Sequence, residues 1–89
     1  MIAKEVVVRS KHGLHARPSA KISEYANRVY PTKVRIVDPK SSTEADARSI
    51  LTMLTLGLVS GTEARVEAEG PMEREAAEEV ARIIEEFDV

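Results

Sequence analysis

The sequence predicts an α+β fold: an open-faced two-layer sandwich in which a four-stranded antiparallel sheet is covered on one face by three helices. Short segments that alternate between apolar and polar residues are typical of antiparallel strands with one face in water. Segments with apolar residues at helical spacing separate them, in the order β-α-β-β-α-β-α. Because the chain has 89 residues and no internal repeat or linker, we expect residues 1–89 to form a single domain.

The first half of the chain contains two predicted strands with a helix between them. Residues 4–9, KEVVVR, are short and rich in β-branched side chains, which favours a strand. Residues 17–29 have apolar residues at helical spacing, with Pro18 suited to the first turn of a helix and Pro31 ending it. Residues 33–37, KVRIV, alternate and predict the second strand.

The second half of the chain supplies two more strands and two more helices. Residues 43–47, TEADA, alternate weakly and suggest a short edge strand, and residues 49–56, SILTMLTL, indicate a short helix. Residues 62–68, TEARVEA, alternate cleanly as a strand. Gly70 and Pro71 then open the last helix. Its apolar residues form one stripe: Ala76, Ala77, Val80, Ile83, Ile84 and Phe87.

Composition excludes several classes of function. There is no cysteine, so disulfides, thiolate metal sites and cysteine nucleophiles are absent. The net charge is −2 with mixed signs, which argues against a nucleic-acid binder. No apolar run approaches the roughly 20 residues of a membrane span. The first residues, MIAKEVVVRS, are too short and too charged for a signal peptide, so we expect a cytoplasmic protein.

The charges are unevenly distributed along the chain. Residues 1–40 are mildly basic, whereas residues 63–89 are acidic. An anionic ligand or an acidic partner would be attracted to the basic end. The basic residues that we expect around His15 are Arg9, Lys11, Arg17, Lys21 and Arg28.

Residues 11–21, KHGLHARPSAK, combine groups suited to phosphate chemistry. Pro18 near a helix start puts His15 just before the first turn, where free N–H groups and the helix dipole bind anions. Arg17 adds a guanidinium that can hold phosphate oxygens, and Gly13 lets the loop turn. Because an imidazole nitrogen can attack phosphorus, His15 could carry a phosphoryl group.

Two simpler interpretations of this stretch are open. A histidine before a helix is most often an ordinary loop or capping residue. The pair in HGLH is also compatible with half of a metal site. Without cysteines or patterned acidic residues nearby, two histidines make a poor metal site, so we expect no metal.

The segment GLHARPSAK resembles the phosphorylation-site motif of HPr, the histidine-containing phosphocarrier family of the bacterial phosphotransferase system. ADARSILTMLTLG is similar to the family's second-helix segment, and SGTEARVEAEGP is similar to its last strand and the start of its last helix. The resemblance spans nearly the whole chain. The order of elements predicted above also matches the open-faced sandwich of the family.

The resemblance implies roles for the residues of the motif. His15 would be the phosphorylated residue, through its δ nitrogen. Arg17 would be the active-site arginine. Ala16 and Arg17 would contribute backbone N–H groups that bind the phosphoryl oxygens.

The second helix carries the other implied sites. Ser49 stands where many family members have a regulatory serine, although a serine before an apolar run is also a good helix N-cap. Ile50, Leu51 and Leu54 match the exposed apolar patch on which partners of the family dock. Apolar residues cover more of this helix than a single core stripe needs, which agrees with a patch of this kind.

The implied function is a phosphocarrier and not an autonomous enzyme. It would accept phosphate from Enzyme I, which takes it from phosphoenolpyruvate, and pass it to a sugar-specific or nitrogen-branch component. We expect no metal, no cofactor, no nucleic acid, no membrane insertion and a monomer; an HPr kinase or a regulator is a further partner. Two alternatives are a purely regulatory HPr paralogue, which would tend to lack the histidine, and an unrelated α+β domain that binds a small ligand.

Three features depart from the family pattern. His12 occupies a loop position that more often has a small polar residue, and it either tunes the basicity of His15 or, as we favour, is a solvated loop residue. Thr52 stands where glycine is common, but the helix should still form. VDPKSSTEADA is longer than in the best-known sugar-branch members, which leaves the sugar and nitrogen branches both open.

Overall fold

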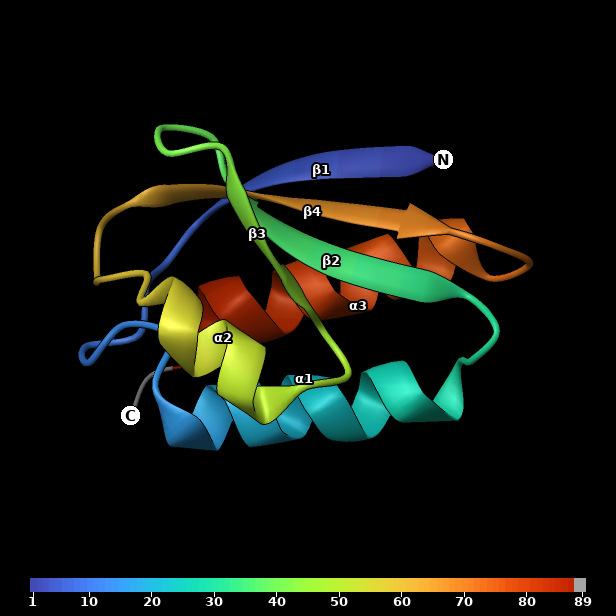
Figure 1. Cartoon of the computed structure of the whole chain (residues 1–89), viewed down its shortest axis with the longest axis horizontal. Coiled ribbons are helices and arrows are strands. Elements are labelled where there is room, and N and C mark those ends of the chain that lie inside the picture. The colour runs from blue at the N-terminus through green and yellow to red at the C-terminus, as the bar shows by residue number, and fades with distance from the viewer. Residues whose placement is uncertain (88–89) are drawn as a thin grey trace.

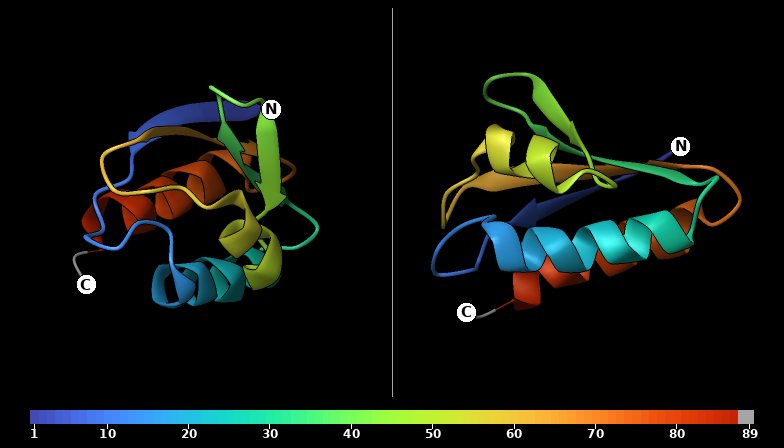
Figure 2. Two further views of the ribbon diagram at one scale, coloured as in Figure 1. Left: turned by 60° about the vertical axis from the view of Figure 1, so that its left-hand side comes forward. Right: turned by 60° about the horizontal axis from the view of Figure 1, so that its bottom comes forward.

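One antiparallel sheet of four strands lies above three helices in Figure 1, and the further views in Figure 2 place the helices on the same side of the sheet. The structure, a computed structural model, describes residues 1–87. The predicted fold class and element order are confirmed. The elements are β1 (Ile2–Val7), α1 (Ala16–Arg28), β2 (Lys33–Asp38), β3 (Thr43–Asp46), α2 (Ile50–Leu56), β4 (Glu63–Glu69) and α3 (Glu73–Glu86).

The strands follow the order β1-β4-β2-β3, so β4 is central and pairs with both β1 and β2. Its alternation places Ala64, Val66 and Ala68 in the interior, as predicted. The first strand begins two residues earlier than expected, because β1 pairs along β4 from Ile2 opposite Ala68 to Val7 opposite Glu63. That strand also ends two residues early, at Val7, and α3 begins at Glu73, after the predicted opening at Gly70 and Pro71; the bounds predicted for the other five elements agree to within one residue.

The interior between the sheet and the helices is aliphatic. α1 and α3 run side by side in opposite directions beneath the sheet (Figure 1). The apolar stripe predicted for α3 is buried along the helix, and Phe87 at its end is half-buried. Met53 is fully buried and anchors α2. Within residues 1–87, no helix has both the length and the apolar composition that crossing a bilayer requires.

Charged side chains pair on the open face of the sheet. Glu67 on β4 accepts hydrogen bonds from the Nε of Arg35 at 2.6 Å and the Nε of Arg65 at 2.8 Å. These bonds, first from Arg65 and then from Arg35, lower the pKa of Glu67 below its ordinary value of 4.5. The folded state therefore favours the ionised carboxylate, and this contribution to stability disappears when the carboxylate is protonated.

The Glu67 interactions predict a pH-dependent stability. Glu67→Gln should lower the free energy of unfolding by about 1 kcal/mol near neutral pH, because two guanidinium groups lose their anion. Since the folded pKa is depressed, the difference should be complete above about pH 5 and vanish as the pH falls through the folded pKa. Urea unfolding at several pH values measures this. Glu63→Gln, at an exposed site on the same face of β4, is the control and should change stability little; an equal loss in both variants would contradict the prediction.

Candidate functional site

His15 is the N-cap of α1, so the position predicted just before the first turn is confirmed. Its backbone is extended, with φ −88° and ψ −169°, and its carbonyl oxygen accepts the N–H of Ser19 at 3.1 Å. The Nδ1 atom accepts the backbone N–H of Arg17 at 3.5 Å, a long and therefore weak hydrogen bond. Nδ1 thus faces the electropositive N-terminus of the helix.

Pro18 limits which backbone groups can bind an anion at this helix end. Proline has no N–H, and the N–H of Ser19 is already used by the carbonyl of His15. The remaining N–H groups of the first turn belong to Ala16 and Arg17, the two residues for which a backbone role was predicted. The side chain of Arg17 is exposed and forms no ion pair with any residue in the described range 1–87.

The loop before His15 is fastened to the segment between α2 and β4. Leu14 is buried, and its N–H donates to the carbonyl oxygen of Leu58 at 2.9 Å. Gly13 has a positive φ of 74°, and a Cβ atom there would collide with the same carbonyl oxygen and lie 3.0 Å from the Cα of Val59. Only glycine allows the loop to approach the segment around Leu58 this closely without strain. His15 is therefore positioned from both sides, by α1 and by the loop.

Two aromatic rings contact His15. The His12 ring lies edge-on, with centroids 5.6 Å apart and planes at 86°, and the Phe87 ring lies 6.0 Å away at 74°. His12 is exposed, as expected of a loop residue, but the favoured interpretation did not include its contact with His15. Phe87 was predicted only as part of an apolar stripe. No sequence pattern signals its contact with His15, because the two residues lie at opposite ends of the chain.

The apolar residues predicted for docking are exposed on α2. Leu51 is 72% exposed, Leu54 42% and Ile50 39%, while Met53 between them is fully buried. We call Ile50, Leu51 and Leu54 the α2 patch. The helix ends at Gly57, next to the Leu58 carbonyl that holds the His15 loop, so the patch and His15 lie on connected segments. Val59, 62% exposed in the following loop, is a further apolar surface residue that sequence patterning did not identify.

Ser49 caps α2 as its residue type predicted. Its Oγ accepts the N–H of Thr52 at 3.2 Å, and it is half-buried at the start of the helix. The Thr52 hydroxyl donates to the carbonyl oxygens of Asp46 at 3.0 Å and Ser49 at 3.1 Å. The helix therefore forms with threonine at this position, as expected, and Thr52 ties its first turn to β3.

The expected basic surroundings of His15 require one correction. Arg28 lies in the last turn of α1, at the opposite end from His15, and pairs with Glu24 at 3.9 Å. A helix rises about 1.5 Å per residue, so thirteen residues of α1 separate the two ends by roughly 20 Å. Arg17 starts the same helix and Lys21 follows one turn later, both exposed. Proximity in sequence overstated how many cations gather near His15.

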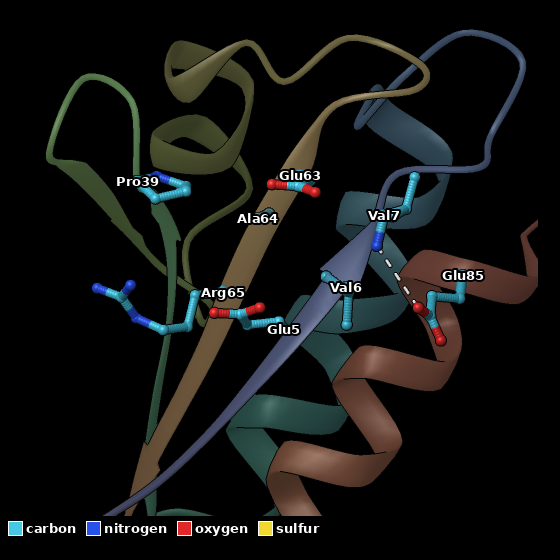
Figure 3. Close-up of a pocket in the computed structure, with 8 residues that line it drawn as sticks. All are labelled: Glu5, Val6, Val7, Pro39, Glu63, Ala64, Arg65 and Glu85. Carbon is cyan, nitrogen blue, oxygen red and sulfur yellow. Dashed lines mark hydrogen bonds between the residues drawn. The ribbon is translucent and has the colours of Figure 1, made fainter.

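Neither a three-ligand metal cluster within residues 1–87 nor the hollow drawn in Figure 3 involves His15. No cluster of three or more histidine, aspartate or glutamate side chains is placed to hold a metal in this range. A hollow of about 250 Å³ is drawn in Figure 3, below the roughly 300–1,000 Å³ typical of ligand sites. None of the predicted site residues lines it; its lining includes Glu5, Val7, Pro39, Glu63, Arg65 and Glu85.

Known proteins are similar to this chain over nearly its full length. The family model described as the PTS HPr component phosphorylation site matches residues 2–86. The phosphocarrier protein HPr of Vibrio cholerae is 33% identical over 87 residues, which cover 98% of this chain and 99% of that protein. The crystal structure of HPr from Bacillus anthracis has a TM-score of 0.85 at 30% identity, covering 94% and 96% of the two chains. Crh from Bacillus subtilis, solved as a swapped-domain dimer, has a TM-score of 0.74 at 35% identity, covering 100% and 99%.

The approach of Gly13 to Leu58 predicts a sharp difference between two glycines. Gly13→Ala should lower the free energy of unfolding by more than about 2 kcal/mol, because left-handed strain adds to a collision with backbone. Gly61→Ala is the matched control, since Gly61 also has a positive φ, 87°, but an added Cβ would meet nothing within 4 Å. It should cost only about 1 kcal/mol. Equal losses in urea unfolding would mean that the contact with Leu58 does not constrain the loop.

Proposed function

The chain belongs to the HPr family of the phosphotransferase system, and from this premise we propose that it carries a phosphoryl group on Nδ1 of His15. The observation that carries the proposal is the direction of Nδ1, which faces the N-terminus of α1 and accepts the N–H of Arg17. A phosphoryl group bonded there would turn its oxygens toward the N–H groups of Ala16 and Arg17. The helix end that now contacts the imidazole would then stabilise the modified residue.

The transfer step needs positioning and charge more than it needs a cofactor. The lone pair of Nδ1 forms the new N–P bond while the bond to the donor breaks, and the electrons of that bond leave with the donor. The exposed guanidinium of Arg17 would bind the phosphoryl oxygens with parallel N–H donors. The chain turns over no small molecule alone, so it is a carrier within a relay and not an autonomous enzyme.

The partners follow from the same relay. Phosphorylated Enzyme I, charged by phosphoenolpyruvate, would be the donor, and a sugar-specific or nitrogen-branch component would be the acceptor, both in the cytoplasm. Exposed apolar residues that are contiguous on a surface mark partner sites, and the α2 patch is such a surface on a segment joined to the His15 loop. We expect a monomer to act in the relay, although the related Crh was solved as a dimer.

A regulatory role is the second candidate function. The similarity to Crh, which its structure describes as a catabolite repression protein, favours this candidate. In that role the chain would bind a regulator and transfer little phosphate. The position of His15 at a helix end, beside the N–H groups of Ala16 and Arg17, supports the carrier. A labelling assay with Enzyme I and phosphoenolpyruvate separates the two roles, because only the carrier should be labelled rapidly and pass its label on.

His15 should be the only phosphorylated histidine. His15→Ala is expected to abolish labelling by Enzyme I and phosphoenolpyruvate, because the nucleophile is lost. His12→Ala is the matched control and should still be labelled, since His12 does not cap α1. The label should be acid-labile and alkali-stable, as expected of a phosphoramidate. Labelling that persists in His15→Ala would rule out the assignment.

The α2 patch should be needed for docking and not for folding. Leu51 is 72% exposed, so Leu51→Glu should change the free energy of unfolding by no more than about 0.5 kcal/mol. It should nevertheless weaken Enzyme I binding at least about tenfold, through loss of apolar contact and burial of a charge. Met72→Glu is the control, because Met72 is an exposed apolar residue at the start of α3, the end of that helix remote from His15. Similar binding by both variants in calorimetric titration would place the docking surface elsewhere.

Ser49 should act as a control point in addition to its capping role. Ser49→Asp keeps a good cap and places a negative charge where the helix end tolerates it, so its melting temperature should stay near that of the wild type. The charge lies at the edge of the α2 patch, so the variant should accept phosphate more slowly than the wild type. Ser49→Ala should lose about 1 kcal/mol of stability and accept phosphate normally. Equal transfer rates for Ser49→Asp and the wild type would leave Ser49 as a cap alone.

A further inference from the structure

His12 places a second imidazole against His15. The ring centroids are 5.6 Å apart and the planes are nearly perpendicular, so one ring meets the other by an edge. His12 is exposed, whereas His15 is half-buried between His12 and Phe87. Of the two rings around His15, only that of His12 carries nitrogen atoms that can donate a hydrogen bond or a positive charge.

The backbone around His12 is fixed by the fold. The N–H of Gly13 donates to the carbonyl oxygen of Ser10 at 3.0 Å, which closes a turn around His12. The next residue, Leu14, is buried and bonded to Leu58. The two imidazoles are therefore near one another before any ligand arrives, and little ordering cost would oppose their joint use.

Charged residues at this end of the molecule come from the loop, from α1 and from α3: Arg9, Lys11, Arg17, Glu85 and Glu86. The segment 57–62 that packs against the loop has no charged residue. Glu85 accepts the N–H of Val7 at 3.4 Å, and Glu86 pairs with Arg82 at 3.5 Å. The loop and the start of α1 thus contribute only cations, which attract a phosphoryl dianion.

We propose that His12 is a second phosphoryl-binding residue, whose protonated imidazole donates to the phosphoryl group on His15; this inference rests on the proposed function. During transfer, Nδ1 of His15 forms the N–P bond, the bond to the donor breaks, and its electron pair leaves with the donor. The proton of His12 stays on His12 throughout, so no further reactant is needed. Charge-assisted donation of this kind stabilises phosphoryl oxygens as they arrive.

Protonation of His12 and phosphorylation of His15 should therefore promote one another, because coupling between two sites is reciprocal. With phosphorylated Enzyme I as donor, the wild type should be phosphorylated on His15 roughly fivefold to tenfold faster than His12→Ala near pH 6. The ratio should fall toward one near pH 8.5, where an ordinary histidine has lost its proton. His12→Lys carries a permanent charge and should keep the advantage over the whole range.

Lys11→Ala is the matched control, because it removes a neighbouring loop charge that does not titrate in this range. Its effect on the rate should be the same at each pH. A second readout needs no variant and no donor during the measurement: in NMR titrations, the His12 ring should protonate at a higher pH in the His15-phosphorylated protein than in the unphosphorylated protein.

The outcomes separate this inference from the proposed function. If the wild type is labelled on His15 but matches His12→Ala at every pH, and His12 titrates alike in both forms, the role of His12 is overturned and the carrier stands. If the wild type is not labelled, or His15→Ala is labelled, the proposed function itself is overturned.

Discussion

The arrangement of the site depends on one backbone hydrogen bond, from the N–H of Leu14 to the carbonyl oxygen of Leu58. It joins the loop that carries His15 to the segment that follows α2, and the burial of Leu14 and Leu58 keeps water from competing for it. Because Gly13 allows the two segments to approach, His15 at the start of α1 and the apolar surface of α2 are held on one rigid unit. A partner that docks on the α2 patch would therefore meet His15 at a fixed position.

The topology explains why this unit forms at one end of the molecule. β4 is the central strand, so its N-terminal connection brings the end of α2 close to the end of β1, where Gly61 donates to the carbonyl oxygen of Val8 at 2.7 Å. α3 runs back beneath the sheet, opposite in direction to α1, and its last turn delivers Phe87 to His15. Three connections, far apart in sequence, thus converge where α1 begins.

Local chemistry made part of this site predictable. His15 could be placed before a helix because proline, here Pro18, is tolerated only in the first turn of a helix. Ser49 could be recognised as a cap because its hydroxyl accepts a hydrogen bond from an N–H only three residues further along the chain. The contacts of His15 with Phe87 and of Leu14 with Leu58 span long stretches of chain, so no local pattern encodes them. The prediction that Arg28 lies near His15 was wrong for a different reason, because a helix separates residues that are close in sequence. The early start of β1 follows from its pairing with β4, which the segment itself does not specify.

The half-buried position of His15 at a helix end fits the proposed role, in which the residue would exchange a phosphoryl group with other proteins. An enclosed site would stabilise a phosphoryl group by desolvation, but it would also keep a second active site from reaching the phosphorus. A helix N-terminus would avoid this problem, because its N–H groups would bind the phosphoryl oxygens on the side facing α1 while the side facing solvent stays accessible. The long hydrogen bond from Arg17 to Nδ1 is consistent with such a role: it orients the imidazole and costs little to break when the nitrogen becomes bonded to phosphorus.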